Sequence, residues 1–222
     1  AESVLRIRLQ RPGYSAGGDG AVVAGHRRGR DGSEFRDGGQ QCPAAPALAT
    51  PARRKVRAAG VAFDTPPNSA GPSTARCYIL VTPDGERTMN TYLGACVNLT
   101  VTDIDSAVVE SAKVTYMEGY LWDRPEAKEA FKRAAAVSRK AGRQTSITLS
   151  DSFCVERHRD SFLDLIRSGI DIVFANESEI KSLYLTQNFD GALQALRKDC
   201  EIAVVTRSAL GSVVAHGDDV LV

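Results

Sequence analysis

The chain has 222 residues, of which 43% are hydrophobic, and a formal net charge of +1. This length is enough to bury one sizeable core, and no apolar run approaches the length of a transmembrane helix. The near-zero charge gives no reason to expect nucleic acid or a membrane as a partner. The five cysteines are scattered and odd in number. They predict neither a disulfide framework nor a metal site, and we expect reduced thiols in a cytoplasmic protein.

The first 55 residues differ in composition from the rest of the chain. They contain nine Gly, nine Arg and one Lys, and their few large apolar residues follow neither a helical nor a strand period. Two interpretations stay open. The segment 1–55 is either a native region of low order or the product of a GC-rich gene read out of frame, which yields Arg, Gly, Ala and Pro. We expect residues 56–222 to hold the folded domain.

The sequence of residues 75 to 92 predicts a β-hairpin. A β-rich run at 77–81 precedes the turn Pro83-Asp84-Gly85, where Pro presets φ and Gly tolerates a positive φ. Residues 87–92 then alternate in the manner of a second strand that runs back along the first. A two-stranded hairpin rarely stands alone, so we expect it to pack on a larger body or on a partner.

Beyond the hairpin, apolar runs typical of strands alternate with helical patterns. We expect strands at 114–118, 145–149, 170–175 and 202–205, and a last hairpin that turns at Gly217-Asp218. Such alternation predicts an α/β fold with a parallel sheet covered by helices on both faces.

The helical segments carry their own start and stop signals. Asp123 with Glu126 predicts a capping box at the start of one helix, and Gly142 is expected to end it. A second, short helix is marked by apolar residues between 162 and 166 and is expected to close at Gly169.

In open parallel sheets, ligands bind at the carboxyl ends of the strands, and polar residues follow two of the expected strands. Asn176 and Glu179 follow the strand at 170–175 at the spacing of a capping box. The Glu179 carboxylate could also organise a hydrated Mg²⁺, which needs few protein ligands. The loop from Thr206 to Gly211 is either an ordinary turn or one whose backbone N–H groups approach phosphate.

Two further carboxylates end strands. Glu118 closes the strand at 114–118, where a charged side chain needs solvent or a partner, and it could accept hydrogen bonds from a polyol. Asp151 stands in the same position after the next strand, and it could equally cap the turn that follows.

Several segments, in order, resemble the ribokinase-like (PfkB) carbohydrate and nucleoside kinases. They are 56–61, the lid-like hairpin at about 74–95, Glu118-Gly119-Tyr120-Leu121, the Asn-x-x-Glu pattern at 176–179 and the loop 204–212. The runs Leu149 to Phe153 and Tyr120 to Trp122 lean towards the adenosine-kinase and sugar-kinase subgroup.

The resemblance implies a ribokinase-like sandwich, with a mostly parallel sheet and a small β lid. It implies transfer of the ATP γ-phosphoryl group to a hydroxyl of a sugar or nucleoside, with Mg²⁺, and a homodimer formed through the lid. In that scheme the substrate-binding residues are Glu118 and Arg76, the ATP-binding residues are Asn176, Thr206 and Gly211, and the metal residue is Glu179.

Departures from the family pattern leave an alternative open. Ser208 stands where the family usually has Gly, a mild change if the backbone keeps a negative φ. The family's Gly-Ala-Gly-Asp motif, whose Asp is the catalytic base, is expected beyond Val222, so the chain resembles a partial kinase truncated at its C-terminus. The alternative is an inactive truncated or frameshifted fragment with at most weak nucleotide binding. A dinucleotide-binding domain is disfavoured, because no expected strand is followed by G-x-G-x-x-G.

Overall fold

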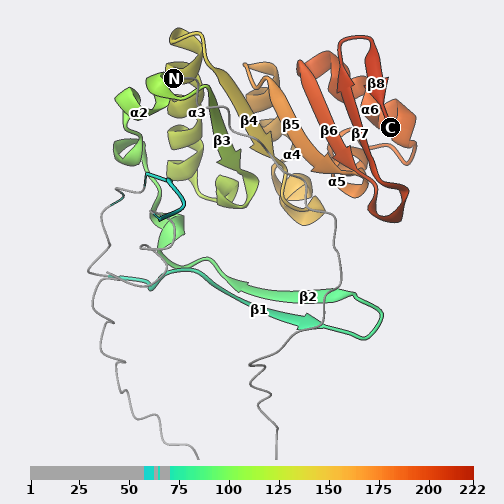
Figure 1. The fold of residues 1–222 in the computed structure, drawn as a ribbon, viewed down its shortest axis with the longest axis horizontal. Helices are drawn as coiled ribbons and strands as arrows, with labels where there is room; N and C mark the ends of the chain where they lie inside the picture. The colour runs from blue at the N-terminus through green and yellow to red at the C-terminus, as the bar shows by residue number, and fades with distance from the viewer. Residues whose placement is uncertain (1–57, 63–64, 66–70) are drawn as a thin grey trace, which may run out of the picture. The chain divides into compact units, whose positions relative to one another are not determined.

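The computed structural model describes residues 58–62, 65 and 71–222 (Figure 1). Strands β1 (Arg76–Val81) and β2 (Arg87–Tyr92) form an antiparallel hairpin in which Val81 pairs with Arg87. Gly85 in the turn has a φ of +86°, as the sequence predicts. The expected low order of residues 1–55 concerns a segment that lies outside the described residues.

Every residue of the β1–β2 hairpin is exposed. Its two faces carry large apolar side chains, among them Tyr78, Leu80, Val81 and Met89. A hairpin that buries none of these side chains is marginal by itself. The dimer expected through this hairpin stays a prediction.

A six-stranded sheet forms the body, in the order β3-β4-β5-β6-β7-β8. The first four strands are parallel to one another, and the last two pair antiparallel. This confirms the parallel sheet and the last hairpin that the sequence predicts. The strands span Val114–Glu118, Gln144–Thr148, Ile172–Asn176, Ile202–Thr206, Ser212–His216 and Asp219–Leu221.

Helices precede and connect the parallel strands. The α-helices are α2 (Ser106–Ser111), α3 (Pro125–Lys140), α4 (Ser152–Arg167), α5 (Glu177–Leu183) and α6 (Phe189–Asp199), and short 3₁₀ helices lie at Gly94–Asn98, Val101–Asp103, Gly119–Asp123 and Ser208–Leu210. Among the described residues, no helix has the length and apolar character needed to cross a membrane.

Helix α4 is longer than the short helix that the sequence predicts. It begins at Ser152, and its backbone departs from helical geometry at His158, where φ is −127° and ψ is 20°. The polar run between the buried Val155 and Phe162 interrupts the apolar period. The pattern therefore revealed only the second half of the helix.

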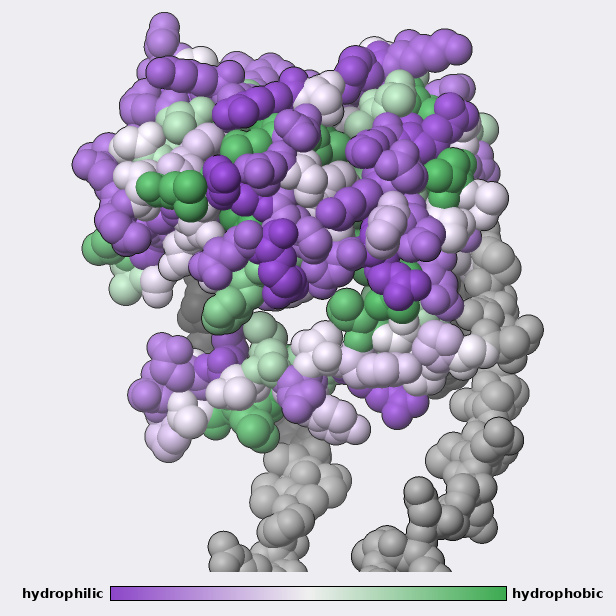
Figure 2. Space-filling model, turned by 180° about the vertical axis from the view of Figure 1, so that it is seen from behind, coloured by the Kyte–Doolittle hydropathy of each residue, from purple (hydrophilic) through white to green (hydrophobic). Residues whose placement is uncertain are grey.

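The helices cover one face of the sheet, which corrects the expected two-sided cover for the part of the chain that the structure describes. Alternate strand residues on the covered face, such as Ile147 and Val173, have no exposed area, whereas Tyr116 on the other face is 56% exposed. In Figure 1 helices α4, α5 and α6 lie behind the sheet, and from that side the surface is mainly hydrophilic (Figure 2). Right-handed crossovers that add each strand in the same direction place every connecting helix on the same face.

The capping box expected from Asp123 and Glu126 is wrong. The N-cap of α3 is Arg124, with Pro125 at the first helical position and no side-chain hydrogen bond to the cap. Asp123 lies one residue too early. Its carboxylate instead accepts hydrogen bonds from His158 Nε2 at 2.7 Å and Arg157 Nη2 at 3.1 Å, and so ties the start of α3 to the kink in α4.

Asp123 should contribute to stability in a pH-dependent way. Burial raises its pKa, but hydrogen bonds from His158 and Arg157 outweigh burial and leave the pKa below its usual value. A lowered folded pKa adds stability at neutral pH that is lost as the pH falls through it. We expect Asp123→Asn to lower the free energy of unfolding by at most about 1 kcal/mol at pH 7, since the pair is partly exposed.

Urea denaturation at several pH values measures this effect. The difference between the wild type and Asp123→Asn should shrink as the pH falls below about 3.9. Glu129→Gln, which removes a carboxylate from an exposed pair with Lys132 on α3, is the matched control and should change stability little. A deficit of Asp123→Asn that is equal at every pH would contradict the charge pairing.

Candidate active site

The carboxyl ends of β5 and β6 bring three of the predicted site residues together. Asn176, the last residue of β5, is the Cα partner of Thr206, the last residue of β6. A hollow of about 190 Å³ opens there, on the uncovered face of the sheet. It is lined by Thr148, Phe174, Ala175, Asn176, Glu179, Val204 and Thr206.

Asn176 and Glu179 form the predicted capping box. The Asn176 side-chain oxygen accepts from the Glu179 backbone N–H at 2.8 Å, and the Asn176 backbone N–H donates to Glu179 Oε2 at 2.9 Å. A third hydrogen bond joins Asn176 Nδ2 to Glu179 Oε1 at 2.7 Å. The box holds the Glu179 carboxylate, which is 3% exposed, in one orientation at the edge of the hollow.

The pKa of Glu179 lies above its usual value. Burial is the main cause, and the negative charges of Asp151 and Glu118 add to it, while the hydrogen bond from the Asn176 backbone opposes it. Asp151 and Glu118 follow or end the neighbouring strands β4 and β3. Carboxylates at the ends of two neighbouring strands therefore act on Glu179 at the same edge of the sheet.

The loop after β6 departs from the expectation for Ser208. Its φ is +52°, so the condition for a mild Gly-to-Ser change, a negative φ, is not met, and the serine occupies a conformation that favours glycine. Gly211 has φ +88° and ψ −136°, a region open essentially to glycine. The Arg207 backbone N–H donates to the Gly211 carbonyl at 2.8 Å and closes the loop.

Arg207 is a residue of this edge that sequence reasoning missed. Its Nε donates to Glu177 Oε2 at 2.9 Å, and its guanidinium lies 3.8 Å from the centre of the Phe189 ring. Lys181 and Arg207 both donate to Glu177 and lower its pKa. The pair ties the loop after β6 to the first residue of α5; a basic residue directly after a strand was the available signal.

The remaining predicted residues have separate settings. Glu118 accepts hydrogen bonds from Ser150 Oγ and from the Tyr116 hydroxyl, the latter at 3.3 Å. Asp151 caps α4 by accepting from the Cys154 backbone N–H at 2.9 Å, which confirms the capping interpretation. Arg76 lies in the hairpin and donates to Ser73 Oγ at 3.0 Å; among the described residues, no hydrogen bond joins it to the sheet edge.

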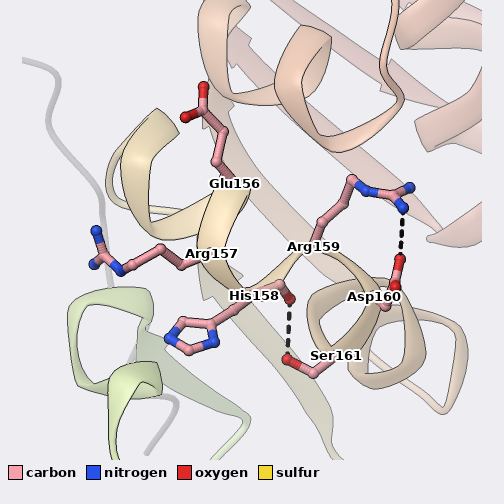
Figure 3. Close-up of a pocket in the computed structure, with 6 residues that line it drawn as sticks. All are labelled: Glu156, Arg157, His158, Arg159, Asp160 and Ser161. Atoms are coloured by element: carbon pink, nitrogen blue, oxygen red, sulfur yellow. Dashed lines mark hydrogen bonds and ion pairs between the residues drawn. The ribbon is translucent and has the colours of Figure 1, made fainter.

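A larger hollow, of about 370 Å³, lies at the kink of α4 and is lined by residues 156–161 (Figure 3). In Figure 3 the side chains of Arg157 and His158 point to one side of the helix and that of Arg159 to the other. The basic groups are already paired, Arg157 and His158 with Asp123 and Arg159 with Asp160. This hollow therefore offers a ligand no unpaired basic group.

The fold and the polar strand ends define an α/β protein with a candidate phosphate-binding edge, and comparison with known proteins gives its family. The model of the pfkB family carbohydrate kinases matches residues 46–222. The chain belongs to this family. No curated protein matches the chain.

Solved structures agree with the family. A probable sugar kinase from Rhizobium etli CFN 42 is 54% identical, with a TM-score of 0.72, over 76% of this chain and 52% of that one. The adenosine kinase from Sinorhizobium meliloti is also 54% identical, with a TM-score of 0.73 and the same coverage. A putative ribokinase II from E. coli, in complex with ATP and Mg²⁺, is 16% identical over 65% of this chain and 48% of that one, with a TM-score of 0.57, and shares the fold. The chain thus spans about half the length of the solved structures that it resembles.

The buried carboxylate of Glu179 should make stability fall with rising pH. Because its folded pKa is raised, the folded state holds its proton more tightly, and stability is lost as the pH rises from about 4.3 through the folded pKa. Glu179→Gln keeps the capping-box residue type and should remove this part of the pH dependence. Urea denaturation of both proteins between about pH 4 and 7 measures it, with the exposed Glu110→Gln as control. Parallel pH profiles for the wild type and Glu179→Gln would refute the assignment.

Ser208→Gly should stabilise the protein. The left-handed conformation costs a non-glycine residue about 1–2 kcal/mol, which glycine avoids. Glycine also loses more conformational entropy on folding, and this loss offsets about half of the gain in stability. We therefore expect a gain of about 0.5–1 kcal/mol, read from thermal or urea unfolding. Ser212→Gly, in strand β7, is the matched control and should destabilise. Equal losses in both variants would show that the backbone at Ser208 is not under strain.

Proposed function

We propose that this protein is an ATP-dependent phosphotransferase that passes the γ-phosphoryl group of ATP to a hydroxyl of a sugar or nucleoside. The observation that carries the proposal is the meeting of Asn176, Glu179 and Thr206 around one hollow at the carboxyl ends of two parallel strands. Ligands bind at this edge in open α/β sheets. Membership of the pfkB family supports the same chemistry.

The nucleotide phosphates are proposed to lie at the hollow, next to Asn176 and Thr206, with the Gly211 loop beside them. At about 190 Å³ the hollow is smaller than the roughly 300–1,000 Å³ typical of a pocket for a whole ligand. It suits a phosphoryl group better than a complete nucleotide. Phosphoryl transfer depends mostly on positioning and on stabilising charge, which fits a rigid edge held by a capping box.

The donors at this edge suit Mg²⁺. Glu179, Asn176 and Thr206 offer oxygen atoms, which Mg²⁺ prefers, and the carboxylate keeps lone pairs beyond its two hydrogen bonds from Asn176. In the part of the chain that the structure describes, no three carboxylate, histidine or cysteine groups gather as a metal site. Glu179 is therefore proposed to hold a hydrated ion through its water. The bound ion would neutralise charge on the phosphates.

The acceptor alcohol is proposed to bind at Glu118, whose carboxylate can accept hydrogen bonds from hydroxyl groups. The two relatives at 54% identity are a probable sugar kinase and an adenosine kinase, so both acceptor classes are proposed. Arg76, on the exposed hairpin, is proposed as a second contact to the acceptor. We assign no general base among the described residues.

Titration calorimetry of the 222-residue chain with ATP and Mg²⁺ tests the proposal. We expect binding that Asn176→Ala weakens by at least about tenfold, since loss of a hydrogen bond to a charged group costs about 1.5–3 kcal/mol. Asn188→Ala is the matched control. Asn188 caps α6 in the same way, so both variants should lose about 0.5–2 kcal/mol of stability, but Asn188→Ala should keep the affinity for ATP.

A second measurement uses a coupled assay of phosphoryl transfer to ribose, fructose and adenosine. Transfer to one of these alcohols, weakened by Glu118→Gln, would support the acceptor site. A chain that is folded by circular dichroism and binds neither ATP nor any of the three alcohols would overturn the proposed function.

A further inference from the structure

We infer that Ser150 is a positioning residue for the acceptor site, which holds the Glu118 carboxylate and the backbone of Tyr120 in place from the neighbouring strand end. This inference rests on the proposed function for its role in binding. Ser150 lies between β4 and α4, and the family resemblance assigned it no role.

Ser150 occupies a strained backbone conformation. Its φ is +73°, which L-residues other than Gly, Asn and Asp rarely adopt. The Asp151 backbone N–H donates to the Leu149 carbonyl at 2.9 Å. A hydrogen bond between residues two apart, around a centre with positive φ, is the rarer and more strained kind of γ-turn. Such strain persists only where the surroundings hold it, and it concentrates at functional sites.

The side chain of Ser150 has a defined use. Its Oγ accepts a hydrogen bond from the Tyr120 backbone N–H at 3.1 Å and donates to Glu118 Oε1. The one hydroxyl therefore contacts residues on both sides of Gly119 and fixes the end of β3 from the end of β4. A hydroxyl can do both at once, because it carries one donor and two acceptor sites.

Gly119 is the counterpart of this contact. A Cβ atom there would meet the Thr148 carbonyl oxygen, and would lie 3.0 Å from both the Leu149 carbonyl oxygen and Ser150 Oγ. The two strand ends approach so closely that only glycine fits between them. Glycine at this position therefore lets the end of β3 lie against residues 148–150, within reach of the Ser150 hydroxyl.

Ser150 is one of two side-chain donors that hold the Glu118 carboxylate in the part of the chain that the structure describes. Apart from Ser150, the side-chain donor to Glu118 among the described residues is the Tyr116 hydroxyl at 3.3 Å, which is a weaker contact.

A double-mutant cycle on the 222-residue chain tests this inference. Ser150→Gly removes the hydroxyl while tolerating the positive φ, so the fold should survive. Calorimetry with the alcohol that binds the unaltered chain should show about tenfold weaker binding, with unchanged affinity for ATP. In a Glu118→Ala background, Ser150→Gly should have no further effect. Leu185→Gly, which relaxes another positive φ on an exposed residue, is the control and should bind as the unaltered chain does.

Amide hydrogen exchange gives a readout that needs no ligand. The Tyr120 amide should exchange faster in Ser150→Gly than in the unaltered chain or in Leu185→Gly. Unchanged acceptor affinity in Ser150→Gly, or losses that simply add to those of Glu118→Ala, would overturn the positioning role. If the unaltered chain binds none of ribose, fructose and adenosine, the acceptor site fails. Amide hydrogen exchange then decides whether Ser150 holds the Tyr120 backbone. Unchanged protection of the Tyr120 amide in Ser150→Gly would overturn that contact.

Discussion

The rest of this structure depends on one constraint, which is that successive parallel strands are added to the sheet in the same direction. Each of the strands β3 to β6 is added on the same side of the one before. With right-handed crossovers, that order sends the connecting helices to one face and all four carboxyl ends to one edge. The helices then bury a single core, in which Trp122 stacks on Phe162, while polar residues gather at the edge. Core and candidate site follow from the same topology.

Local signals decide how the edge is built. At the end of β5 the residues that start helix α5 are the residues that line the hollow, so helix formation and site geometry come from one set of hydrogen bonds. At the ends of β4 and β6 the chain instead accepts unfavourable backbone conformations, at Ser150 and Ser208. Strain of this kind needs support from packed neighbours. The close approach of Gly119 gives such support to Ser150.

Much of this arrangement could be predicted from the sequence, because its signals are local. The strand Val114–Glu118 and the capping box of Asn176 and Glu179 were predicted with the bounds that the structure has. The features that escaped depend on contacts between distant residues. Asp123 lies one residue before the N-cap of α3 and pairs instead with Arg157 and His158, more than 30 residues further along the chain. The pairing of Arg207 with Glu177 and the contact of Ser150 with Glu118 also join residues that no spacing rule connects.

Under the proposed function Glu179 has two uses, and this double use has an evolutionary consequence. A side chain that only caps a helix can drift among several residue types, and one that serves only a site can change when the ligand changes. Glu179 does the first by its hydrogen bonds to Asn176 and is placed for the second by its position on the hollow. Under the proposed function, selection for foldability and selection for chemistry act on the same two residues, Asn176 and Glu179. Fewer residue types should be tolerated at these two positions than their burial alone would allow. A stabilising substitution elsewhere could restore the abundance of a variant at these positions without restoring its site.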